Sequence, residues 1–188
     1  DVNKGRILID GIDINEISEE SYRKLIDAVQ QEPILFNMSI MDNISIGQSN
    51  ASIEQIRNAA KMANIDDDIM EMQEGYNTII NDGISDNLSV GQKQRIALAR
   101  TLLKNCKIIL FDEVTSALDN ISQELVIDTI NSLKSTHTVV VISHKLLTII
   151  DSDEIFVMDN GKIVDHGKHS YLMNNCLYYK EMYVKEVA

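Results

Sequence analysis

The sequence is poor in several residue types that would mark other classes of protein. It has no tryptophan, one proline and eight glycines in 188 residues, which excludes collagen-like chains and chains disordered by an excess of proline and glycine. Its two cysteines, Cys106 and Cys176, show neither metal-ligand spacing nor a disulfide framework, so we expect reduced thiols. Its apolar runs, such as residues 108–111 and 139–142, are much shorter than the roughly 20 residues that span a bilayer. We therefore expect no membrane span in this chain.

Basic residues are also scarce. There are 17 Lys and Arg against 29 Asp and Glu, which gives a formal net charge of -12. An acidic surface repels a phosphate backbone, which argues against nucleic acid as a partner. With 44% hydrophobic residues, the chain has the length and apolar content of one globular domain with its own core.

The hydrophobic pattern alternates between strands and helices in the first and last parts of the chain. This alternation predicts an α/β domain with a short β ribbon at its start and a mostly parallel sheet covered on both faces. The expected elements are a ribbon at residues 6–14, strands at 28–29, 107–111, 138–142, 155–158 and 162–164, and helices at 21–26, 121–133, 145–150 and 171–187.

The middle of the chain has a different, mainly helical pattern. Ser52 and Gln55 have the spacing of a capping box at the start of a helix, and Asp66 begins another expected helix. We therefore expect one domain over residues 1–188, with an α/β core of residues 1–38 and 104–188 and an inserted helical subdomain of residues 39–103.

Two acidic residues, Asp112 and Glu113, directly follow the apolar run of residues 108–111. Ligands of open α/β sheets bind at the carboxyl ends of parallel strands. Mg²⁺ prefers one or two carboxylates together with phosphate oxygens and water, and a neighbouring carboxylate can polarise an attacking water. The pair therefore indicates a metal and phosphate site, and the alternative is a solvated strand end.

Ser89, Gly91 and Gln92 stand at the start of a run of strong helix formers. Ser89 has the N-cap position and Gln92 the capping-box position. Free amides and the positive end of the helix dipole attract anions, and Gly91 allows a phosphate close to the backbone. The alternative is an ordinary, well-capped helix without a ligand.

Three further polar side chains lie at the ends of expected elements. His144 follows the strand at residues 138–142, where an imidazole can donate to a phosphoryl group, although single histidines are more often structural. Gln31 follows a short strand, where its side chain can reach a metal ion or water. Asp119 precedes a helix, where it is most simply an N-cap.

In combination and in this order, these segments resemble the ATPase domain of an ATP-binding cassette (ABC) transporter of the exporter type. The resemblance covers essentially the whole chain, and the order of the motifs makes it specific. It implies a P-loop NTPase-like (RecA-like) fold with an inserted helical subdomain and an N-terminal antiparallel β piece. The matching motifs are the Q-loop at 29–33, the signature at 88–92, the Walker B strand at 108–113, the D-loop at 116–119 and the switch histidine at 142–144, and the exporter-like segments are 33–44 and 112–119.

The resemblance implies ATP and Mg²⁺ as ligands and assigns roles at the strand ends. Asp112 and Gln31 would hold Mg²⁺ beside the bound ATP, and Gln31 would also link the metal and water to the membrane partner. Glu113 would polarise the attacking water, and His144 would contact the γ-phosphate. Hydrolysis of ATP would power export of a substrate that the sequence does not identify.

The resemblance also implies two partners. Ser89, Gly91 and Gln92 of one domain would close over the ATP of a second ABC ATPase domain, in a head-to-tail homodimer or heterodimer with Asp119 at the seam. A transmembrane domain, fused upstream or separate, would hold the chain at the cytoplasmic face of the cell membrane.

One motif of the family is missing from this sequence. No glycine fits the P-loop pattern Gly-x-x-x-x-Gly-Lys-Ser/Thr, whose amides, lysine and hydroxyl hold phosphates and Mg²⁺. We expect a cassette truncated at its N-terminus and inactive alone. The alternatives are a non-hydrolysing partner cassette that supplies the signature to another subunit, and a nucleic-acid ATPase, which the charge disfavours. Val90 stands where the commonest signature has Gly, and Gln30 stands where the Q-loop often has Pro, but Ser89 and Gly91 of the signature remain.

Overall fold

The computed structural model describes residues 2–81 and 88–187, so the parts of the expected domain at residues 1, 82–87 and 188 lie outside it. The chain begins with an antiparallel ribbon of β1 (Leu8–Ile9) and β2 (Ile12–Asp13). Asp10 and Gly11 join the two strands with φ values of 49° and 83°, the left-handed conformation that a tight hairpin turn requires. This confirms the expected ribbon.

The centre of the fold is a three-stranded parallel sheet. It consists of β3 (Ile26–Val29), β4 (Ile108–Asp112) and β5 (Thr138–Ile142), with β4 in the middle. A separate antiparallel pair, β6 (Ile155–Asp159) and β7 (Lys162–Gly167), follows. The predicted α/β fold with a mostly parallel sheet is confirmed.

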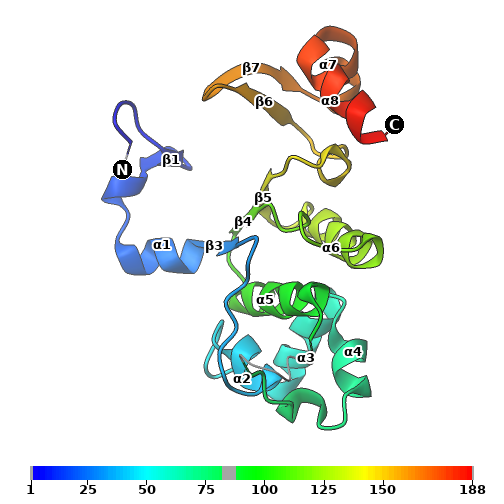
Figure 1. The fold of residues 1–188 in the computed structure, drawn as a ribbon. Coiled ribbons are helices and arrows are strands. Elements are labelled where there is room, and N and C mark those ends of the chain that lie inside the picture. Colours follow the sequence, from blue (N-terminus) through cyan, green and yellow to red (C-terminus); the bar gives the residue numbers. More distant parts are fainter. Residues whose placement is uncertain (1, 82–87, 188) are drawn as a thin grey trace.

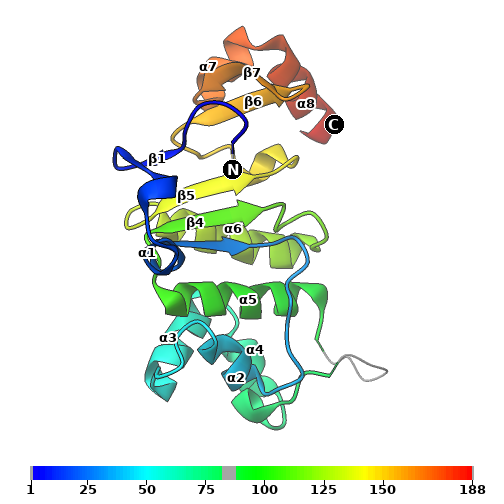
Figure 2. The ribbon, with the colours of Figure 1, turned by 90° about the vertical axis from the view of Figure 1, so that its left-hand side faces the viewer.

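Helices occupy most of the remaining chain. Figures 1 and 2 place α2, α3 and α4 on the side of α5 that faces away from the sheet. The α-helices are α1 (Glu19–Leu25), α2 (Ile40–Ser45), α3 (Ile53–Met62), α4 (Asp66–Glu71), α5 (Val90–Lys104), α6 (Asn120–Leu133), α7 (His169–Asn175) and α8 (Leu177–Val187), and the 3₁₀ turns are η1 (Ile14–Glu16), η2 (Gly75–Asn77) and η3 (Leu146–Thr148).

One large hydrophobic core joins the parallel sheet to the helical region. Ile109 and Phe111 of β4 belong to the same buried cluster as Ile96 of α5 and Ile65, which precedes α4. A second, smaller cluster holds the β6–β7 pair against α7 and α8. Burial of apolar surface is the main force that holds such layers together. Among the described residues, no helix is both long enough and apolar enough to cross a membrane.

The structure differs from the expected pattern in three places. The tail forms two helices, because buried Cys176 is extended between them and packs in the second cluster. The expected helix at residues 145–150 is only the 3₁₀ turn η3. The sheet is not covered on both faces by the described residues, since the side chains of Val140 and Ile142 on β5 are exposed.

Candidate functional site

The carboxyl ends of the three parallel strands bring four of the predicted site residues to one edge of the sheet. Asp112 is the last residue of β4 and pairs with Ile142 of β5. Glu113 and His144 therefore leave neighbouring strands at the same level, and Gln31 follows the parallel end of β3. Figure 2 shows the three arrowheads pointing the same way.

Glu113 and His144 approach each other at this edge. His144 Nδ1 lies 3.5 Å from Glu113 Oε1, and both side chains are accessible, at 60% and 36%. The backbone of Glu113 is left-handed, with φ of 48°, which is unusual for a residue other than glycine. Its amide donates to the carbonyl of Ile142 at 2.9 Å, so β5 holds this conformation. Backbone strain of this kind clusters at functional sites.

Asp112 and Gln31 are both exposed, so their oxygens can take a ligand. The loop of Gln31 is held from below, because Nε2 of buried Gln94 on α5 donates to the carbonyl of Gln30 at 2.9 Å. In the described part of the chain, no group of three or more His, Cys, Asp or Glu side chains is placed to hold a metal ion. One carboxylate and one amide fit Mg²⁺ that takes its other ligands from phosphate and water.

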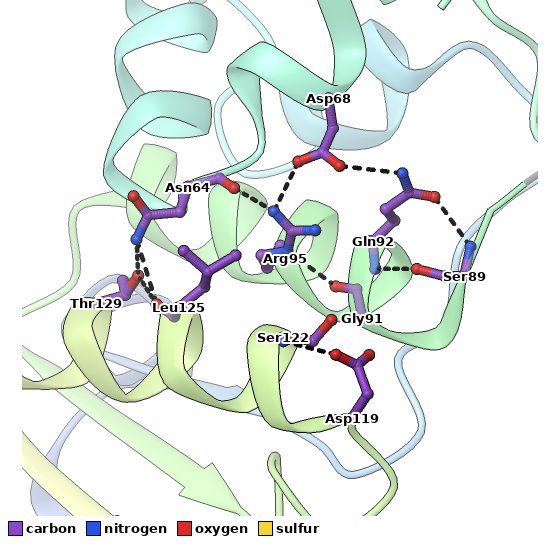
Figure 3. Close-up of polar contacts among 10 residues, drawn as sticks. All are labelled: Asn64, Asp68, Ser89, Gly91, Gln92, Arg95, Asp119, Ser122, Leu125 and Thr129. Atoms are coloured by element: carbon purple, nitrogen blue, oxygen red, sulfur yellow. Dashed lines mark hydrogen bonds and ion pairs between the residues drawn. The ribbon is translucent and has the colours of Figure 1, made fainter. Parts of the chain in front are cut away.

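The start of α5 has the predicted capping box, which Figure 3 shows. Ser89 Oγ accepts from the amide of Gln92 at 3.1 Å, and Gln92 Oε1 accepts from the amide of Ser89 at 3.0 Å. The expected N-cap and capping-box positions are therefore confirmed. Because the cap leaves other amides of the first turn without helical partners, this end of α5 can attract an anion.

The start of α6 packs directly against the start of α5. A Cβ on Gly91 would lie 2.2 Å from Ser122 Oγ and 3.9 Å from Asp119 Oδ2. Asp119 is the N-cap of α6, since its Oδ1 accepts from the amide of Ser122 at 3.0 Å. That backbone hydrogen bond lowers the pKa of the Asp119 carboxyl. The structure thus brings Asp119 and Gly91 together within one chain.

A polar network behind the α5 start contains residues that the sequence pattern did not single out. Asp68 on α4 accepts from Gln92 Nε2 at 3.2 Å and from an Arg95 guanidinium nitrogen at 2.8 Å. Arg95 also donates to the carbonyl of Asn64, whose side chain donates to Thr129 Oγ1 on α6 at 3.2 Å. Figure 3 shows this chain of contacts between α4, α5 and α6. No local spacing signals it, because the partners are far apart in the sequence.

These features define a class of protein. An open parallel sheet with an acidic pair and a histidine at its carboxyl edge has these groups where α/β domains bind their ligands, and the capped start of α5 is a helix end of the kind that attracts anions. The family model described as ABC transporter matches residues 1–116 of this chain, and the chain belongs to that family.

Individual relatives agree with this assignment. ABC transporter B family member 1 of Dictyostelium discoideum is 46% identical over 176 residues, covering 93% of this chain and 19% of the relative. The ATM1-type heavy metal exporter of Novosphingobium aromaticivorans is 42% identical over 186 residues, covering 98% of this chain and 30% of the relative. The chain is therefore similar to the ATP-binding domain of ABC exporters and spans less than a third of either relative.

A solved structure gives the same result for the fold. The structure of a bacterial Atm1-family ABC exporter with ATP bound superposes with a TM-score of 0.92 and is 41% identical. The match covers 100% of this chain and 33% of that chain. This supports the P-loop NTPase-like fold.

Proposed function

We propose that this chain is the ATP-hydrolysing domain of an ABC exporter. The observation that carries the proposal is the pair of Glu113 and His144, which meet at the carboxyl edge of the sheet with Glu113 in a left-handed conformation. The names of the relatives support export as the coupled process. In this proposal the transmembrane domain of the transporter selects the transported substrate.

The side chains at the strand ends have separate roles in the hydrolysis of ATP. Asp112 and Gln31 hold Mg²⁺, which neutralises charge on phosphate oxygens when it is bound. Glu113 accepts a proton from the attacking water, general-base help worth about 10²- to 10⁴-fold. His144 carries its proton on Nε2 in this proposal and donates it to a γ-phosphate oxygen, while its Nδ1, 3.5 Å from Glu113 Oε1, can accept from the Glu113 carboxyl once Glu113 has taken the proton from water. The proton therefore moves from water to Glu113 while His144 orients the phosphate.

The start of α5 serves a second nucleotide in this proposal. Ser89, Gly91 and Gln92 close over the ATP of another ABC ATPase domain in a head-to-tail dimer, either a homodimer or a heterodimer, and Asp119 lies at the seam. The capped helix start supports this role, because its amides and dipole favour a phosphate. A transmembrane domain is the other partner and places the chain at the cytoplasmic face of the membrane.

Glu113→Gln tests the hydrolytic role in the full-length gene product. A neutral amide cannot take the proton from water, so we expect turnover to fall by about 10²-fold or more while ATP binding persists. Phosphate release and nucleotide binding are measured side by side. Glu124→Gln on the exposed side of α6 is the matched control and leaves turnover unchanged. Equal turnover in Glu113→Gln and the parent protein contradicts the proposal.

A non-hydrolysing partner cassette is the second candidate function. The fully formed capping box at Ser89 and Gln92 favours this second function. The signature segment at the start of α5 is formed in this chain, although the chain contains no P-loop motif. When the 188-residue chain is mixed with an intact cassette, ATP-dependent association supports this function if the chain itself adds no hydrolysis. We expect the 188 residues alone to bind ATP weakly.

A further inference from the structure

Lys145, the residue after His144, joins the switch segment to two other elements. Its Nζ donates to the carbonyl of Thr115 at 2.9 Å and to Gln123 Oε1 on α6 at 2.8 Å. Thr115 is two residues beyond Glu113. A lysine ammonium has three donors and a flexible stem, so two fixed acceptors hold it in one place.

A second contact joins the same segments. The hydroxyls of Thr115 and Thr148 lie 3.0 Å apart, and both residues are buried. The amide of Glu113 is bonded to the carbonyl of Ile142, as described above. Residues 113–115 are therefore fixed to the segment around His144 by three separate contacts. These are the Glu113 amide with Ile142, the two threonine hydroxyls, and the Lys145 ammonium with Thr115.

The main chain around His144 is also held from its other side. The amide of Lys145 donates to Ser143 Oγ at 3.0 Å, and the amide of Leu146 donates to Glu186 Oε2 on α8 at 2.6 Å. The His144 side chain remains 60% exposed. A fixed backbone with an accessible imidazole is the arrangement that preorganised catalytic groups need.

We propose that Lys145 is a positioning residue that sets His144 against Glu113 and ties both to α6. Asp119 caps the first turn of α6, and Ser122 in that turn packs on Gly91, so the same ammonium connects the strand-end site to the α5 start. Without the ammonium, the two segments keep the threonine contact but lose their direct link to α6. This inference rests on the proposed ATPase function.

Lys145→Met removes the ammonium and keeps the aliphatic stem. In the full-length gene product we expect kcat for ATP hydrolysis to fall about tenfold while KM for ATP changes less than about twofold. Lys145→Arg keeps donors for both acceptors and restores most of the kcat. Lys134→Met is the matched control: its Nζ donates to the carbonyl of Asp151 at 2.9 Å, away from His144, and its loss leaves kcat unchanged.

A double-mutant cycle separates positioning from general destabilisation. If Lys145 acts through His144, Lys145→Met lowers kcat in the parent protein but has no further effect when His144 is already alanine. Equal loss in both backgrounds, or a loss no larger than that of Lys134→Met, overturns the inference. If the parent protein hydrolyses no ATP, the proposed function fails and this inference with it; an active parent with an unaffected Lys145→Met variant refutes the inference alone.

Discussion

Gly91 shows how a single residue sets the distance between two helices. Its place near the start of α5 lies against Ser122, and an added Cβ would be 2.2 Å from Ser122 Oγ and 2.6 Å from Ser122 Cβ. Its backbone does not require glycine for any turn, so the close approach is what selects glycine here. Alanine favours a helix over glycine, but only where there is room for its methyl group.

We therefore expect Gly91→Ala to lower the free energy of unfolding by about 1–3 kcal/mol, since the methyl group overpacks the contact with Ser122. Urea unfolding of the 188-residue chain measures this. Ser122→Gly removes the clashing atoms, so Gly91→Ala costs less in that background, and the difference between the two backgrounds gives the coupling. A Gly91→Ala variant as stable as the parent would show that α6 moves away freely.

The helices separate what the sequence predicts from what it does not. The capping boxes that begin α3 and α5 were predictable, because Ser52 with Gln55 and Ser89 with Gln92 are three residues apart and act locally. The tie from Asn64 to α6 was not, because its partners follow more than 60 residues later. Local order can be read from spacing, whereas contacts between elements depend on the packed fold.

Asp66, the first residue of α4, also makes contacts between elements, which depend on the packed fold. It is 4% exposed, and its carboxylate accepts from Arg57 Nε at 3.1 Å and from the Tyr76 hydroxyl at 2.6 Å. The hydrogen bonds from Arg57 are the main cause that lowers the pKa of Asp66, and burial opposes them. Desolvation and the Asp66 carboxylate together raise the pKa of Tyr76.

The lowered pKa of Asp66 predicts an acid-sensitive contribution to stability. The unfolded chain binds the proton first, at a pKa of about 3.9, so the contribution is complete above that pH and is lost as pH falls through the folded pKa. We expect Asp66→Asn to be less stable than the parent at pH 7, and the difference to shrink below about pH 4. Urea unfolding at several pH values measures it, and a pH-independent difference would contradict the assignment.

At the scale of the whole molecule, the strand-end motifs predicted that the candidate site residues lie at one edge of the sheet. Parallel strands all end on one side, so Glu113 and His144, which follow β4 and β5, come together there once the two strands pair. The prediction that both faces of the sheet are covered was wrong for the described residues. A cavity of about 710 Å³ lies between β5 and β6 and is lined by residues of both strands, including Val139, Val141 and Phe156. The sequence of a strand shows which of its side chains are apolar, but it does not show which other elements pack over them.

The β5 edge at this cavity predicts a pattern of amide exchange in the 188-residue chain. The amide of Thr138 donates to the carbonyl of Lys107, so in a parallel ladder every second amide of β5 faces β4 and those of Val139 and Val141 face the other way. Amides without a strand partner exchange quickly. We expect Val139 and Val141 to exchange faster in NMR measurements than Thr138, with the central strand β4 as the internal control because both of its edges are paired. Equal protection along β5 would contradict this prediction and show that its outer edge is covered.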